Sequence, residues 1–69
     1  RSMTNIQVRA DSDSAWRSYG AVKETDMEKL KDMCEVIFPV VCERWGVDDI
    51  YFRFTQNGEV MGDEFHLWA

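Results

Sequence analysis

An alternating apolar pattern over residues 50–69 requires a sheet with one buried face. In the stretch IYFRFTQNGEVMGDEFHLWA, Ile50, Phe52 and Phe54 are separated by single residues of different character. Such alternation predicts a strand whose successive side chains point to opposite faces. The pair at residues 57–58, Asn-Gly, is the strongest two-residue signal for a hairpin turn. These residues are therefore predicted to form an antiparallel hairpin.

The register of this hairpin is left open by the sequence. A tight Asn-Gly turn pairs Phe54 with Met61, but its simple continuation places Asp63 on the apolar face. A longer connection pairs Phe54 with Phe65 instead, and this keeps the face apolar. A tight turn followed by a bulge at Gly62 and Asp63 has the same effect. Each solution leaves the same residues on the opposite face.

Two further strands are predicted at the start of the chain. Residues 5–10, NIQVRA, alternate cleanly between apolar and polar side chains. The turn-rich tetrad DSDS separates them from a second predicted strand over residues 15–22, AWRSYGAV. Gly20 marks a possible bulge in that strand, so its facing is not fixed by the pattern.

A helix is predicted between the two hairpins, from Thr25 to Trp45. The sequence TDME indicates a capping box, in which the Thr25 hydroxyl accepts from the N–H of Glu28 and the Glu28 carboxylate accepts from the N–H of Thr25. Arg44 in the last turn complements the helix dipole. Gly46 supplies the left-handed residue that ends the helix.

Pro39 lies inside this predicted helix, where it costs about 3 kcal/mol in isolation because it removes a donor and crowds a carbonyl. A buried strand over VIFPVVC is the alternative, but a central proline argues against it. A winding of about 100° per residue places Pro39 on the expected solvent side, where it bends the helix outward. The same side carries an acidic row: Glu28, Asp32, Glu35 and Glu43.

The predicted helix has more apolar surface than one sheet face needs. Its core stripe consists of Met27, Leu30, Cys34, Ile37, Phe38, Val41 and Trp45. A second stripe beside it consists of Met33, Val36 and Val40. Together they cover roughly two-thirds of the circumference, wider than the stripe of a helix on a single sheet. Either the sheet curls around the helix, or the second stripe is a seam with another copy of the chain.

These elements predict an α+β fold of order ββαββ, in which one proline-kinked helix crosses one face of a four-stranded antiparallel sheet. The 69 residues fit a single domain over residues 3–69. Residues 1–2, which precede Met3, have the character of a cloning remnant. A domain of this size buries roughly 60% of its unfolded surface, so self-association is a natural source of extra stability.

Charge and cysteine content narrow the possible environments. Thirteen acidic and eight basic residues give a net charge of −5, which disfavours a grip on duplex DNA. Cys34 and Cys42 are about 12 Å apart along one helix, too far for an internal disulfide, and are expected as reduced thiols. No membrane-length apolar run and no signal-like apolar segment after Met3 are present in the sequence. A cytoplasmic location without a membrane partner is therefore expected.

The sequence predicts no catalytic residue, metal site or cofactor. His66 is the one histidine, and no serine lies in the context of a nucleophile elbow. The acids of the DSD and VDD segments lack the spacing of a calcium loop. No glycine-rich loop suited to phosphate is present in the sequence either.

The sheet face away from the helix is predicted to be cationic and aromatic. In the longer register, Arg53 lies opposite His66 and Tyr51 opposite Trp68. Gln7 shares this face. The candidate partner-binding residues there are Arg9, Arg17, Tyr19, Tyr51, Arg53, His66 and Trp68. Tyr, Trp and Arg commonly dominate binding energy between proteins, although such residues also occur as simple cross-strand pairs on a wet sheet face.

The function expected from these surfaces is that of a small acidic protein-interaction module without enzymatic activity. It would act as a homodimer, or as a stoichiometric binding partner or inhibitor of another protein. The acidic helix row fits an inhibitor that occupies a basic groove, and equally a solvated helix face. The alternative is binding of single-stranded nucleic acid, since aromatic and arginine side chains on a sheet can stack on bases.

Overall fold

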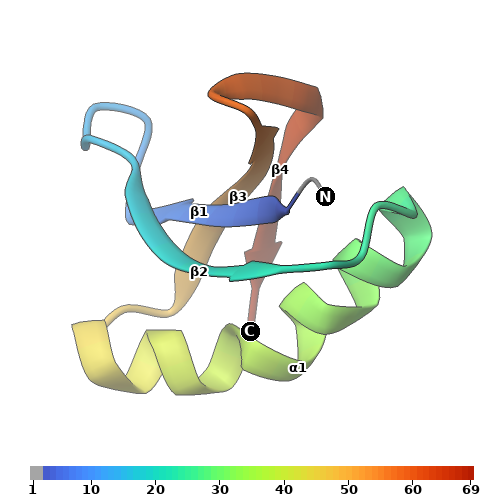
Figure 1. Cartoon of the computed structure of the whole chain (residues 1–69). Coiled ribbons are helices and arrows are strands. Elements are labelled where there is room, and N and C mark those ends of the chain that lie inside the picture. Colours follow the sequence, from blue (N-terminus) through green and yellow to red (C-terminus); the bar gives the residue numbers. More distant parts are fainter. Residues whose placement is uncertain (1–2) are drawn as a thin grey trace.

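The predicted ββαββ fold is confirmed by a computed structural model that describes residues 3–69 (Figure 1). The elements in chain order are β1 (Thr4–Arg9), β2 (Arg17–Val22), α1 (Met27–Trp45), β3 (Asp49–Gln56) and β4 (Glu59–Trp68). The predicted cloning remnant at residues 1–2 lies outside the described part of the chain.

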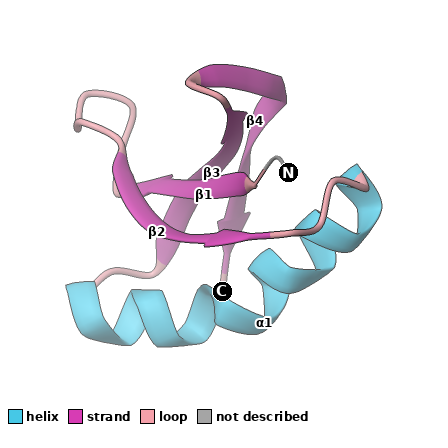
Figure 2. Cartoon of the chain, in the orientation of Figure 1, coloured by secondary structure: helices cyan, strands magenta, loops and turns pink. Residues whose placement is uncertain are grey.

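The four strands form one antiparallel sheet in the order β2-β1-β3-β4 (Figure 2). β1 and β3 are therefore central, and β2 and β4 are edge strands. α1 lies across one face, and it packs most extensively against β3 among the strands. The side of the sheet opposite α1 is called the far face below.

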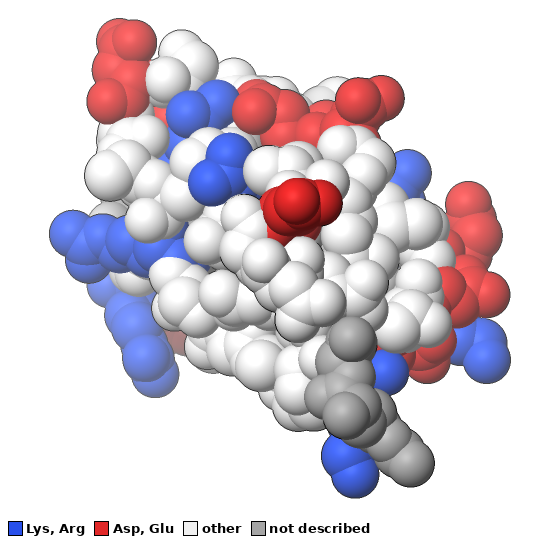
Figure 3. Space-filling model, turned by 45° about the horizontal axis from the view of Figure 1, so that its top comes forward, with Lys and Arg blue, Asp and Glu red and all other residues white. Residues whose placement is uncertain are grey.

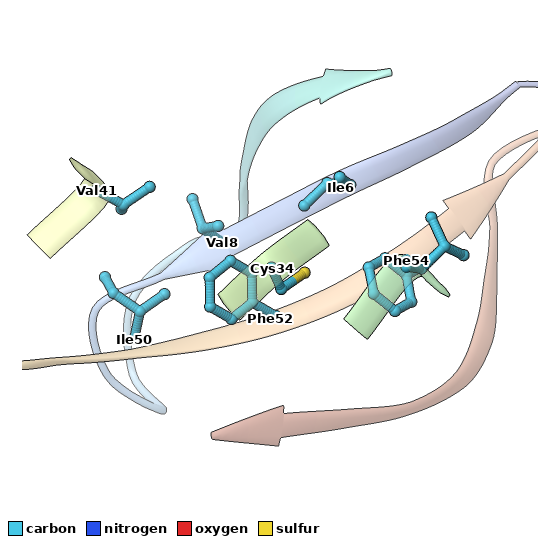
Figure 4. Close-up of a cluster of buried hydrophobic side chains, with 8 residues drawn as sticks. Ile6, Val8, Cys34, Val41, Ile50, Phe52 and Phe54 are labelled. Atoms are coloured by element: carbon cyan, nitrogen blue, oxygen red, sulfur yellow. The ribbon is translucent and has the colours of Figure 1, made fainter. Parts of the chain in front are cut away.

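The core lies between α1 and the two central strands (Figure 4). Its fully buried residues alternate along both strands and recur along the helix, as the sequence predicts: Ile6, Val8, Leu30, Cys34, Val41, Ile50, Phe52 and Phe54. The remaining residues of the predicted helical core stripe are partly buried and pack against this cluster. The edge strand β2 contributes little to it, since most of its residues are exposed.

The helix begins one residue later than predicted. Asp26, and not Thr25, is the N-cap residue, and its carboxylate accepts hydrogen bonds from the backbone N–H groups of Glu28 and Lys29 at 2.9 and 3.3 Å. The predicted capping box is therefore wrong. Glu24 accepts from the N–H groups of Thr25 and Asp26, so the backbone before the helix is already held by a different carboxylate.

The end of the helix and its internal proline agree with the sequence. Gly46 adopts a left-handed conformation with φ 68°, and its N–H donates to the Cys42 carbonyl. Pro39 is inside α1 on the exposed side, and the helix bends along its length in Figure 1. The exposed position lets the carbonyl that loses its donor remain hydrated.

The β3–β4 hairpin combines a tight turn with a bulge, one of the solutions left open by the sequence. Asn57 and Gly58 both have positive φ, and Phe54 pairs with Met61. The ladder then shifts, so that Phe52 pairs with Phe65. The longer connection, which pairs Phe54 with Phe65, is therefore wrong. The extra residues of β4 restore an apolar face without placing Asp63 in it.

The first hairpin also contains a bulge, next to the glycine that the sequence singles out. Ile6 pairs with Gly20 and Gln7 with Ser18, so Tyr19 is the extra residue of β2. The strand begins at Arg17, two residues later than predicted. Because Arg17 pairs with the buried Val8, its side chain lies on the helix side of the sheet.

We expect Asp26→Ala to lower the free energy of unfolding by about 1 kcal/mol, because two backbone N–H groups lose their acceptor. In a domain of this size, that corresponds to a fall in Tm of about 4–8 °C. Thr25→Ala is the matched control, with an expected change of less than about 0.5 kcal/mol. Equal losses in thermal denaturation would contradict the assignment of Asp26 as the cap.

The buried thiol of Cys34 gives the fold a pH dependence. Burial raises the pKa of Cys34 from 9.0 to about 12, so the unfolded chain loses this proton at lower pH than the folded chain. The stabilisation from this group is fully present below about pH 9 and is lost as the pH rises toward 12, by up to about 1.4 kcal/mol per pH unit. Urea unfolding of Cys34→Ala should therefore depend less on pH in this range than unfolding of the wild type. An equal change of the unfolding free energy with pH in the two proteins would contradict Cys34 as the source of this pH dependence.

Candidate functional site

The far face carries a row of stacked rings from β3 and β4. The Tyr51 and His66 rings are parallel, with centroids 4.2 Å apart and 8° between their planes. Trp68 continues the row, with its ring centroid 5.2 Å from that of His66. The observed register pairs Tyr51 with His66 and Asp49 with Trp68, which replaces the predicted pairs of Arg53 with His66 and Tyr51 with Trp68.

Trp16 covers the other part of the far face. The guanidinium carbons of Arg9 and Arg53 lie 4.3 and 4.5 Å from the centroid of the Trp16 ring. Arg9 is also 5.8 Å from the centroid of Tyr51. These distances are within the range of cation–π contacts, which contribute about 0.5–1 kcal/mol each at exposed sites. One indole from the β1–β2 loop therefore holds two arginines of the sheet.

Polar groups within the same chain complete these contacts. Arg9 forms an ion pair with Glu64 at 3.0 Å, and the Arg53 side chain donates to the Gln7 amide oxygen. His66 Nε2 is 2.7 Å from a carboxylate oxygen of Asp49. The far face is thus largely occupied by its own contacts, and Trp68, with 67% of its surface exposed, is the exception among the residues predicted there.

Both signs of charge are present over the surface. In Figure 3 the basic side chains form separate groups, and acidic groups and a wide uncharged area lie between them. The face in that view has no continuous basic track.

Trp16, Asp49 and Glu64 also belong to this face, although the sequence does not predict them there. The alternation of β2 carries the missing signal: once Arg17 lies on the helix side, the residue before it belongs to the far face. The sequence does not fix the position of the bulge near Gly20, and one extra residue reverses the facing of every residue on one side of it. The face on which Trp16 lies therefore does not follow from the alternation alone.

Arg17 and Tyr19 do not lie on the far face, contrary to the prediction. The Arg17 guanidinium carbon is 5.7 Å from the centroid of a Trp45 ring in α1. Tyr19 lines the gap between β2 and the helix, because the bulge turns its side chain to that side. Arg9, Tyr51, Arg53, His66 and Trp68 occupy the far face as predicted.

An open groove separates β2 from α1. Its apolar part has a volume of about 460 Å³ and is lined by residues 19–22 of β2, by Met33, Val36 and Ile37 of α1, and by Ile6. It continues past Tyr19 into a more polar part of about 530 Å³, which contains Val40, Arg44 and Trp45 of α1 and Arg17 of β2. In Figure 1, β2 runs along the helix over much of its length. The groove is therefore bounded by an edge strand on one side and by a helix on the other.

The second apolar stripe of α1 forms the helical rim of this groove. Val36 is 75% exposed and Val40 51% exposed, while Met33 is half-buried. The sheet therefore does not curl around the helix to cover them, and one of the two predicted explanations for the wide stripe is wrong. The acidic row, Glu28, Asp32, Glu35 and Glu43, is exposed as predicted.

Other features of residues 3–69 offer no site for a metal ion. In this part of the chain, no three His, Cys, Asp or Glu side chains lie together as potential ligands.

Both cysteines are free thiols. Cys34 is buried, and Cys42 is half-buried, with its pKa raised by burial and by the carboxylates of Asp48 and Asp49. No helix between residues 3 and 69 has the length and apolar character needed to cross a bilayer.

Comparison with protein-family models, with curated proteins and with solved structures finds no match for this chain. Functional inference therefore rests on the geometry of the far face and of the groove.

We expect Trp16→Ala to lower the free energy of unfolding by about 2 kcal/mol, because two arginines lose their cation–π partner and apolar surface becomes exposed. Trp68→Ala is the control on the same face, with an expected loss of about 0.5 kcal/mol or less. Chemical denaturation measures both. Similar losses for the two variants would mean that Trp16 does not organise the far face.

Proposed function

We propose that this chain is a protein-interaction module that binds its partner through the groove between β2 and α1. The exposed apolar rim of the groove carries the proposal: Val36, 75% exposed, borders its apolar part, and Val40, 51% exposed, borders its more polar part. Exposed apolar surface next to a concave site is typical of surfaces that bind another protein. The edge strand β2 adds main-chain groups that a partner can pair with.

The groove supports this function better than the far face does. Side chains of the far face already stack on one another and satisfy one another's charges, so a partner there would have to replace existing contacts. Val36, by contrast, has most of its surface in contact with solvent. Covering exposed apolar side chains releases free energy at roughly 25 cal/mol per Å², without the loss of an existing contact.

Binding of single-stranded nucleic acid has weaker support. Stacking on bases requires free aromatic faces and arginines, but Trp16 already holds the guanidinium groups of Arg9 and Arg53. Glu64 adds negative charge beside Arg9, and Asp49 adds it beside His66. The net charge of −5 opposes attraction of phosphates over a longer range.

An enzymatic role also has little support. His66 is held by the Asp49 carboxylate, as in many catalytic dyads, but its ring is stacked on Tyr51. Among the described residues, no hydroxyl or thiol forms a hydrogen bond to the imidazole that would mark a nucleophile. A cytoplasmic location is part of the proposal and rests on the two free cysteines.

The proposal predicts that Val40→Glu removes binding to protein partners. A charge placed on the apolar rim of the groove must be desolvated in any complex, which costs several kcal/mol. Val60→Glu is a matched control, because Val60 is also 51% exposed but lies next to the β3–β4 turn. Association is measured by the solution mass of the purified chain and by quantitative capture of proteins on the immobilised chain.

We expect wild type and Val60→Glu to show equal association, and Val40→Glu to show little or none. Loss of association in Tyr51→Ala or Trp68→Ala, with full association in Val40→Glu, would contradict the proposal. That result would instead assign binding to the far face. Circular dichroism and thermal denaturation of each variant establish that the fold is retained.

A further inference from the structure

The rim of the groove on α1 has opposite charges at equal distances from its centre. Val36 is at its centre, with Met33 three residues before it and Val40 four residues after it. Seven residues are close to two turns of an α-helix, so Lys29 and Glu43 lie on the same side as Val36, one near each end of the rim. Asp32 and Pro39 border the same side and are exposed, so the order along it is Lys, Asp, Met, Val, Pro, Val, Glu.

The charges along this side of α1 are complementary to those of a second, antiparallel copy of the same helix. When two identical helices pack antiparallel about a two-fold axis through Val36, residues before Val36 face residues after it in the other copy. Residues equally far from Val36 then face each other: Lys29 faces the other copy's Glu43, Met33 faces its Pro39, and Asp32 faces its Val40. Both charged side chains are exposed, and neither takes part in an ion pair within residues 3–69. The interface would thus contain an apolar centre of Val36, Met33 and Pro39 from both copies, with Asp32 beside the other copy's Val40 and one ion pair at each end.

We propose that the occupant of this surface is a second copy of the chain, with the two α1 helices antiparallel and the two-fold axis at Val36. This inference rests on the proposed function, since it names the partner of the same surface. A parallel arrangement would place like charges together at both ends, Lys29 beside Lys29 and Glu43 beside Glu43. Charge therefore selects the antiparallel arrangement, while the apolar centre supplies the affinity.

The size of the chain favours this partner. A standard interface buries about 800 Å² on each side, which is about a sixth of the 4611 Å² of accessible surface described here. The 19-residue helix has a length of about 28 Å, so its exposed side and the adjoining edge of β2 offer a surface of that order. A small domain with a core of few residues gains stability from such association.

The charged ends of the rim provide the test. Lys29→Glu leaves two negative groups at each end of the proposed interface, and Glu43→Lys leaves two positive groups. We expect each variant to raise the dissociation constant of the homodimer by about tenfold, because attraction becomes repulsion at two symmetric contacts. The double variant with both changes exchanges the charges and should recover an affinity close to that of the wild type.

Mixing the two single variants gives a second, independent readout. In a mixed dimer every end pairs a positive with a negative group, so the mixture should associate more tightly than either variant alone. Sedimentation velocity across a dilution series measures the wild type, the two single variants, the double variant and the mixture. The gain from mixing should decrease at high salt, because the end contacts are exposed.

Three results would overturn this inference. A wild-type chain that stays monomeric, but captures another protein in a Val40-dependent way, would exclude the second copy and leave the proposed function intact. A homodimer whose affinity is the same in all charge variants would exclude the antiparallel arrangement about Val36. A monomer that captures nothing through the groove would contradict both proposals.

Discussion

The packing of β3 against α1 is the interaction on which the rest of the structure depends. Ile50, Phe52 and Phe54 are fully buried, and they face Leu30 and Cys34 of the helix. Because β3 is a central strand, the same alternation that buries these residues sends the residues between them to the far face. One helix can cover only part of such a sheet. The edge strand β2 is left at the margin, and the groove follows from that mismatch.

The two candidate surfaces differ in how completely the chain satisfies them itself. On the far face, Trp16 stacks with two arginines, and Tyr51 stacks with His66, so aromatic and charged groups serve mainly to hold loop and strands together. On the groove side, Val36 and Val40 have no such cover. Residue types typical of binding surfaces can therefore serve a structural role when their partners lie in the same chain. The exposed fraction of the side chains distinguishes a binding surface from a structural one better than the residue types do.

Much of the architecture follows from periodicity in the sequence. The alternation around Phe52 and the period of the helix up to Gly46 predict the element order, the core and the excess stripe correctly. The face to which each side chain of β2 points does not follow from the sequence. The bulge at Tyr19 reverses the alternation of the strand, and its position depends on pairing with β1. The cap at Asp26 was also missed, because neighbouring residues compete for the same N–H groups and local sequence does not rank them. Trp16 illustrates the same limit, since one of its two partners, Arg53, lies far away in the chain.

The central claim, that the groove side and not the far face binds a partner, is tested most directly by NMR of the wild-type chain over a range of concentrations. The three tryptophan indoles are internal probes, with Trp45 beside the groove and Trp16 and Trp68 on the far face. The proposed association predicts that backbone signals of α1 around Val36 shift with concentration, together with the Trp45 indole, while the two far-face indoles do not. Shifts confined to Trp16, Trp68 and their neighbours would contradict the claim.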